Sequence, residues 1–287
     1  MSSVLRLVAG SGLMLLLALA PARAAQEALL ASPWVLADNA RVRVVAAHAN
    51  GHAGKPRLMA GVEIELADGW KTYWRQPGTS GVAPRIDWSG SGNLAQARLL
   101  FPAPTRFIDR DDVTIGYKKA VVLPIEMTPK DRALPVDLKL AVDLGICKDL
   151  CIPVELALTL RIPPDVGTMP ADSRFAAFLD RVPVASSARG PTDPSIVATR
   201  SDLGGDHPRL VIDAAFPNGI AGADLLLEGP DGVWVPIPKL IGPIADNVLR
   251  FEINLSEGSD IAGLIRKPLL ATLVSNNGRA EATVTIE

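Results

Sequence analysis

The stretch VDLKLAVDLGICKDLCIPVELALTLRI, residues 136–162, decides the fold class of this chain. Apolar side chains occupy the even positions from Val136 to Ile146 and again from Val154 to Ile162. This period of two is typical of half-buried β-strands, because successive side chains of a strand point to opposite faces. The short segment between the two runs therefore predicts a pair of neighbouring antiparallel strands.

Short strands of the same kind are predicted through most of the chain. They are separated by turn residues at intervals of about 8–12 positions, a spacing typical of β-sandwiches. The 24 prolines and 24 glycines agree, since they favour turns over long helices. We therefore expect an all-β protein with two β-sandwich domains, at residues 26–163 and 196–287.

Two segments fall outside these domains. Residues 1–25 begin with one positive charge at Arg6, continue with an apolar run and end on small residues, a pattern that predicts a cleavable secretory signal peptide. We expect export to the periplasm and no membrane insertion after cleavage. Residues 164–195 are rich in Pro, Ser and Gly and predict a linker.

The linker carries the signal for one short helix, at 171–181. Phe175, Phe178, Leu179 and Val182 fall at the i, i+3, i+4 and i+7 positions of one helical face. We expect this apolar face to pack across the junction between the two domains.

The charge balance excludes some classes of partner. The formal net charge is −2, from 29 basic and 31 acidic residues that are spread evenly along the chain. A nucleic-acid or anionic-membrane surface would need clustered positive charge, so we expect no nucleic-acid partner.

Cys147 and Cys151 are the only cysteines and the sharpest chemical feature of the chain. An even number of cysteines in an exported protein predicts a disulfide, and a purely structural bridge is one interpretation. However, a loop of about five residues gains only about 2 kcal/mol from closure, against nearly 5 for a loop of about 100. Both cysteines also occupy odd positions, so we expect both sulfurs on the exposed outer face, where they can react.

A metal site is the alternative interpretation. Two thiolates could bind Cu(I), which prefers soft ligands, and Met127 or Met169 could add a thioether, although an isolated Met is more often part of a core. Zinc would need four ligands, and no histidine lies near the cysteines in sequence. The acidic residues Asp109, Asp111 and Asp112 are expected to form a solvated loop. We expect no cofactor.

An ordered set of four motifs resembles a known family. The motifs are DGWKTYWR at 68–75, FP at 101–102, YKKAVVLP at 117–124 and GICKDLCIP at 145–153. Together they resemble the N-terminal periplasmic domain of the disulfide reductase DsbD. The spacing of the cysteines is similar to that in its relatives of the copper-sensitivity suppressor type, ScsB. The resemblance covers residues 35–163.

The resemblance implies a fold and a role for several residues. The fold would be an immunoglobulin-like sandwich in which Cys147 and Cys151 form the redox-active pair. Tyr73 and Trp74 would line the site, together with Tyr117. The stretch from Asp109 to Ile115 would form a cap loop that shields the cysteines.

The resemblance also implies partners. A thioredoxin-like donor or a membrane electron carrier would reduce the pair, and the pair would reduce periplasmic disulfide-containing acceptor proteins. Because this sequence has neither the multi-span membrane section nor the thioredoxin domain of that family, we expect its electrons to come from another protein. The functional hypothesis is therefore thiol–disulfide interchange, and the alternative is a Cu(I)-binding copper-tolerance protein that uses the same two thiolates.

Overall fold

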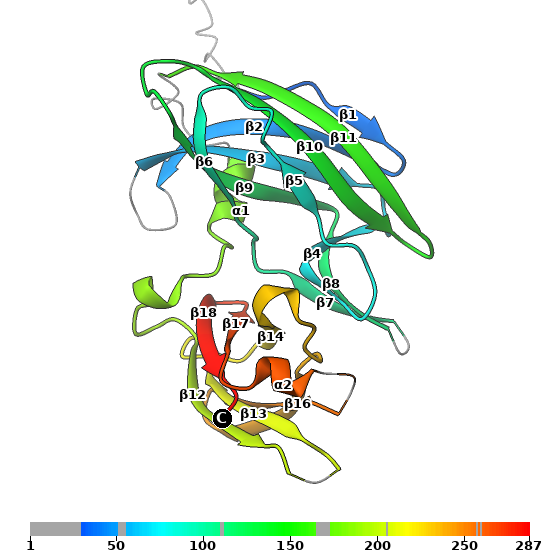
Figure 1. Cartoon of the computed structure of the whole chain (residues 1–287), viewed down its shortest axis with the longest axis vertical. Coiled ribbons are helices and arrows are strands. Elements are labelled where there is room, and N and C mark those ends of the chain that lie inside the picture. Colours follow the sequence, from blue (N-terminus) through cyan, green and yellow to red (C-terminus); the bar gives the residue numbers. More distant parts are fainter. Residues whose placement is uncertain are drawn as a thin grey trace, which may run out of the picture.

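Two immunoglobulin-like β-sandwiches follow one another along the chain, as expected from the sequence (Figure 1). The computed structural model describes residues 30–50, 56–109, 112–164, 173–204, 206–256, 258 and 260–287. The predicted signal peptide, Asp111 and Met169 lie outside the described residues. No helix in these ranges is long and apolar enough to cross a membrane.

The first sandwich contains strands β1 to β11. One sheet has the order β1-β2-β3-β9-β6, formed by Val35–Ala37, Ala40–Asn50, Pro56–Leu66, Ala120–Pro129 and Leu94–Leu99. The facing sheet has the order β11-β10-β4-β8-β7, formed by Cys151–Ile162, Val136–Cys147, Lys71–Gly78, Asp112–Lys118 and Thr105–Asp109. The short strand β5, Arg85–Asp87, pairs with β10 in the same sheet.

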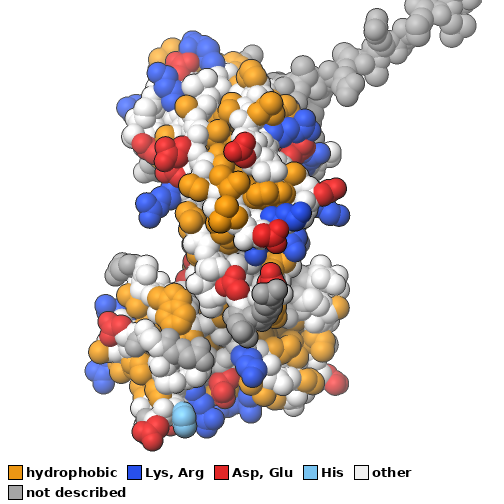
Figure 2. Space-filling model, turned by 90° about the vertical axis from the view of Figure 1, so that its right-hand side faces the viewer, with side chains coloured by type: hydrophobic (Ala, Val, Ile, Leu, Met, Phe, Trp, Pro, Cys, Tyr) orange, Lys and Arg blue, Asp and Glu red, His pale blue; other side chains and the backbone are white. Residues whose placement is uncertain are grey.

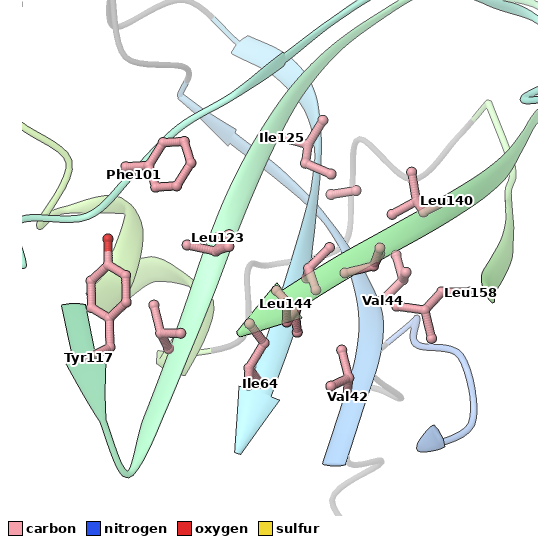
Figure 3. Close-up of a cluster of buried hydrophobic side chains, with 14 of the residues drawn as sticks. Val42, Val44, Ile64, Phe101, Tyr117, Leu123, Ile125, Leu140, Leu144 and Leu158 are labelled. Atoms are coloured by element: carbon pink, nitrogen blue, oxygen red, sulfur yellow. The ribbon is translucent and has the colours of Figure 1, made fainter. Parts of the chain in front are cut away.

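Residues 136–162 form β10 and β11. The two strands pair antiparallel without interruption from Val136 opposite Ile162 to Cys147 opposite Cys151. Their even-numbered side chains face the core, where Leu140, Leu144 and Leu158 meet residues of the opposite sheet (Figure 3). The alternation therefore predicted both the strands and their buried face correctly.

The second sandwich contains strands β12 to β18. One sheet has the order β12-β13-β16-β15, formed by Ser195–Asp202, Arg209–Ala215, Val248–Asn254 and Lys239–Ala245. The other has the order β14-β17-β18, formed by Asp224–Glu228, Pro268–Ser275 and Gly278–Thr285. Two short helical segments, η3 (Pro230–Gly232) and α2 (Ile261–Leu264), connect strands of this sandwich, and a third, η2 (Ser186–Ala188), precedes β12. A separate cluster of buried side chains forms the core of this sandwich.

The predicted helix is present as α1, Ser173–Leu179, but it packs in a different place from the one expected. Its buried Phe175 contacts the outer face of the first sandwich, in a cluster with Val45, Met59 and Val122, instead of crossing the domain junction. Gly61 makes room for it, because a Cβ there would lie 2.8 Å from the Phe175 ring. The helix therefore covers the outer face of the five-stranded sheet, over β2, β3 and β9.

The two sandwiches meet at a narrow waist. Figure 2 shows this waist from the side that lies to the right in Figure 1, with acidic and basic side chains just above it. The end of the first sandwich that faces the waist carries β4, β7 and β8 (Figure 1). These three strands also surround the cysteine pair.

Candidate redox site

The two cysteines close the tip of the β10–β11 hairpin. Cys147 is the last residue of β10 and Cys151 is the first of β11, and they form a disulfide with a Cα–Cα distance of 4.2 Å. The three residues between them, 148–150, are exposed. The disulfide therefore lies at the end of the sheet and not between two sheets.

The expectation that both sulfurs are exposed is wrong for Cys147. Cys151 is exposed, but Cys147 is only 1% exposed. The outer face of β10 is covered at this end: a Cβ on Gly145, two residues earlier, would lie 3.0 Å from Val82 and 3.1 Å from the Tyr73 ring. Strand parity predicts which face a side chain occupies, but it does not predict whether another segment covers that face. Of the pair, Cys151 is therefore the exposed residue and Cys147 the buried one.

Tyr73 contacts the exposed sulfur directly. Its hydroxyl oxygen lies 3.1 Å from Cys151 Sγ, and its side chain is 1% exposed. Burial, and then the negative charge of Asp112, raise the pKa of the Tyr73 phenol. The phenol is therefore protonated at neutral pH and can donate a hydrogen bond to a Cys151 thiolate in the reduced protein.

A glycine holds the Tyr73 ring in this position. Gly81 has a φ of +123°, and a Cβ there would lie 2.3 Å from Tyr73 Cε1. Any other residue at position 81 would both strain the backbone and displace the ring.

A cavity of about 600 Å³ opens over the disulfide. Its lining combines the cysteines and Tyr73 with charged and hydroxyl side chains: Lys71, Ser80, Asp109, Asp112, Lys148 and Asp149. Asp112 accepts hydrogen bonds from Thr79 Oγ1 at 2.6 Å and Ser80 Oγ at 2.7 Å, and these bonds lower the pKa of its carboxyl group. The acids oppose thiolate formation and the lysines favour it, so the cavity has no single electrostatic sign.

The residues expected to line the site divide into two groups. Tyr73 and Asp109 line the cavity, whereas Trp74, Ile115 and Tyr117 lie in the core of the first sandwich. Trp74 follows Tyr73 on strand β4, so it points to the opposite face of the sheet. Tyr117, which Figure 3 shows among the buried side chains, donates a hydrogen bond from its hydroxyl to the carbonyl oxygen of Pro102, at 2.7 Å. This bond fixes the chain between the two sheets. These three residues pack in the core beneath strands β4 and β8 and do not line the cavity.

Several residues of the cavity were not predicted. Lys71 and Ser80 line it, and Thr79 and Val82 hold its walls. The only local signal was the pair of glycines around Thr79 and Ser80, which marks a turn. Its position over the cysteines depends on the pairing of β4 with both β8 and β10, which the sequence does not show.

For a metal ion the described residues offer few ligands beyond the two sulfurs. No cluster of three or more His, Cys, Asp or Glu side chains in the described ranges is arranged to hold a metal. Met127, considered as an additional Cu(I) ligand, is 3% exposed and belongs to the hydrophobic core. It is therefore a packing residue.

Comparison with known proteins agrees with this geometry. Residues 41–162, which include both cysteines, match the family model described as thiol:disulfide interchange protein DsbD, N-terminal. The solved N-terminal periplasmic domain of ScsB from Proteus mirabilis is 26% identical, and the match covers 90% of this chain and 99% of that one, with a TM-score of 0.67. No curated protein matches the chain. The first sandwich of this chain is thus similar to the N-terminal domain of DsbD, and the whole chain is similar to the N-terminal periplasmic domain of ScsB.

Proposed function

We propose that this protein is a periplasmic thiol–disulfide interchange protein that passes electrons through Cys147 and Cys151. The observation that carries the proposal is the asymmetry of the disulfide. Cys151 is an exposed residue whose sulfur lies beside the Tyr73 phenol, and the Cys147 to which it is bonded is buried. Exchange requires one sulfur that a partner can reach and a second that can displace the partner afterwards.

The reductive half of the cycle begins at Cys151. A donor thiolate attacks Cys151 Sγ, the Cys147–Cys151 bond breaks, and the electron pair of that bond leaves on the Cys147 sulfur, which takes up a proton. The second thiol of the donor then loses its proton and attacks the donor's first sulfur, the one bonded to Cys151. Cys151 leaves as a thiolate. The pair gains two electrons and the donor becomes a disulfide.

The second half transfers the same two electrons to an acceptor. The Cys151 thiolate attacks the acceptor disulfide and forms a mixed disulfide, and one acceptor thiolate leaves. Cys147, deprotonated, then attacks Cys151 Sγ, which restores the internal disulfide and frees the second acceptor thiol. The Tyr73 hydroxyl stabilises Cys151 whenever that sulfur carries negative charge, because a hydrogen bond to an ionised acceptor is stronger than one to a neutral acceptor.

The compartment and the partners are part of the proposal. A persistent disulfide needs an oxidising compartment, and the similar ScsB domain is periplasmic by its description. The donor would be a thioredoxin-like protein or a membrane electron carrier. The acceptors would be periplasmic proteins with disulfides.

A reduction assay tests the proposed function. The oxidised protein is mixed with reduced thioredoxin, and free thiols are counted after an acid quench; dithiothreitol serves as the reference reductant. We expect thioredoxin to reduce the disulfide much faster than dithiothreitol does at equal thiol concentration. If dithiothreitol opens the bond but thioredoxin does not, the bridge is structural and the proposed function is wrong.

A further inference from the structure

Two walls of the disulfide cavity are each bound to the second sandwich by an arginine. Strand β4 carries Tyr73 at the cavity and Arg75 two residues later. Strand β7 carries Arg106 and, three residues later, Asp109 at the cavity. Both arginines reach β14 of the second sandwich, which lies next to these strands in Figure 1.

The contact of Arg106 is the more complete of the two. Its Nε and one terminal nitrogen donate to the two carboxylate oxygens of Asp224, at 2.9 and 2.6 Å. The guanidinium also donates to the carbonyl oxygens of Pro238 at 2.7 Å and Leu225 at 3.0 Å. The Arg106 side chain is only 17% exposed. This bidentate geometry fixes the direction of the arginine as well as its position.

Arg75 makes a second contact of the same kind. It donates to Glu228 at 2.8 Å and to Glu281 at 2.8 Å, and its guanidinium lies 4.5 Å from the centre of the Trp74 ring. The side chains of all three charged partners are less than one quarter exposed. Strand β4 is therefore held against the second sandwich two residues beyond Tyr73.

One face of β14 supplies a carboxylate to each arginine. Its even-numbered residues Asp224, Leu226 and Glu228 face the first sandwich: Leu226 belongs to the core cluster of that sandwich, and the two acids bind the arginines. The odd-numbered Leu225 and Leu227 belong to the core of the second sandwich. A partly buried ion pair adds little net stability over an apolar contact. If these residues only held the two sandwiches together, further apolar side chains like Leu226 would do so equally well.

We propose that the second sandwich positions the redox site of the first, with Asp224 and Arg106 as positioning residues. The Arg106–Asp224 pair holds the β7–β8 hairpin against the cavity, and this hairpin places Asp109 and Asp112 beside the disulfide. The Arg75–Glu228 pair holds β4, and with it Tyr73, beside Cys151. That this positioning affects thiol–disulfide interchange rests on the proposed function. That it limits access to the disulfide does not.

The proposal predicts that the disulfide reacts faster when the Arg106–Asp224 pair is broken. Without the pair, the hairpin samples open positions more often, and a small reductant reaches Cys151 with less hindrance and less repulsion from the two aspartates. We expect Asp224→Asn to raise the second-order rate constant for reduction by dithiothreitol about five-fold or more. Arg106→Lys keeps the charge but loses the bidentate fork, so a smaller increase in the same direction is expected.

A matched control separates positioning from general loosening. Asp213 is also a carboxylate of the second sandwich held by two arginines, Arg200 and Arg250, but it lies in the four-stranded sheet on β13. Asp213→Asn removes a comparable ion pair without touching β14. We expect it to lower the melting temperature and to leave the reduction rate at the wild-type value.

The measurement is made on the full oxidised chain at a temperature well below the melting transition of each variant. Faster reduction of Asp224→Asn and Arg106→Lys, with Asp213→Asn unchanged, supports the proposal. Wild-type rates for folded Asp224→Asn and Arg106→Lys overturn it, as does an equal acceleration in Asp213→Asn. If Asp224→Asn does not fold, Arg106→Lys decides the result alone. Because the reductant is dithiothreitol, failure of the protein to react with thioredoxin would refute the proposed function without affecting this comparison.

Discussion

The Tyr73 hydroxyl should control the acidity of the exposed thiol, and Tyr73→Phe removes that hydroxyl with little change of shape. In the reduced protein the phenol, 3.1 Å from Cys151 Sγ, would donate to the thiolate. A hydrogen bond to a charged group contributes about 1.5–3 kcal/mol, and the exposure of Cys151 places this bond near the lower end, about 1.5 kcal/mol. Since one pKa unit corresponds to about 1.4 kcal/mol, we expect the Cys151 pKa to rise by about one unit in the variant.

The assay follows alkylation of a single thiol. In a Cys147→Ser background only Cys151 reacts, and the rate of reaction with iodoacetamide against pH gives its pKa. Tyr117→Phe is the control, because it also removes a buried hydroxyl of the first sandwich, one that binds the Pro102 carbonyl oxygen. If Tyr73→Phe and its parent give the same pH profile, the phenol does not act on the sulfur and this reasoning is refuted.

Four further predictions follow from the same structure. Gly81→Ala should destabilise the fold by about 2 kcal/mol, because a positive φ and the Tyr73 ring both oppose a Cβ, and urea unfolding measures the loss. Phe175→Ala should cost about 3 kcal/mol and expose α1 to proteolysis, since the ring is 1% exposed on the first sandwich; an unchanged urea midpoint would contradict this. The pKa of Asp112 is lowered in the fold by hydrogen bonds from two hydroxyls, so the stability it contributes is present above its unfolded pKa and is lost as pH falls through its folded pKa. Asp112→Asn should therefore lower the melting temperature at neutral pH but not in strong acid, and equal losses at both would refute the assignment. Reducing the disulfide should cost at most about 2 kcal/mol, because the loop it closes is so short; thermal melts of both redox forms test this, and collapse on reduction would show a structural bridge.

The sequence predicted the elements whose signal is local. The alternation from Val136 to Ile162 predicted β10, β11 and their buried face, because a strand with one buried face must repeat its apolar residues every second position. The apolar spacing around Phe175 likewise predicted a helix. In both segments the pattern lies in residues that are close together along the chain.

What the sequence did not predict depends on contacts between distant segments. Cys147 occupies an outward position but is buried, because Tyr73 and Val82 cover that end of β10. Helix α1 packs on the first sandwich because Gly61 leaves space for a ring, and nothing in the helix itself indicates that space. The even-numbered face of β14 was also beyond prediction, since its acids acquire a role only opposite Arg75 and Arg106.

In the proposed cycle, electrons enter and leave the pair through the sulfur of Cys151. This role of Cys151 is tested most directly by trapping the mixed disulfide. The oxidised protein is mixed with a reduced thioredoxin whose second active-site cysteine is replaced by serine, quenched in acid, alkylated and mapped by mass spectrometry. We predict a covalent complex in which thioredoxin is bound to Cys151 and Cys147 carries the alkyl group. A thioredoxin bond to Cys147, or no complex at all, would contradict the account.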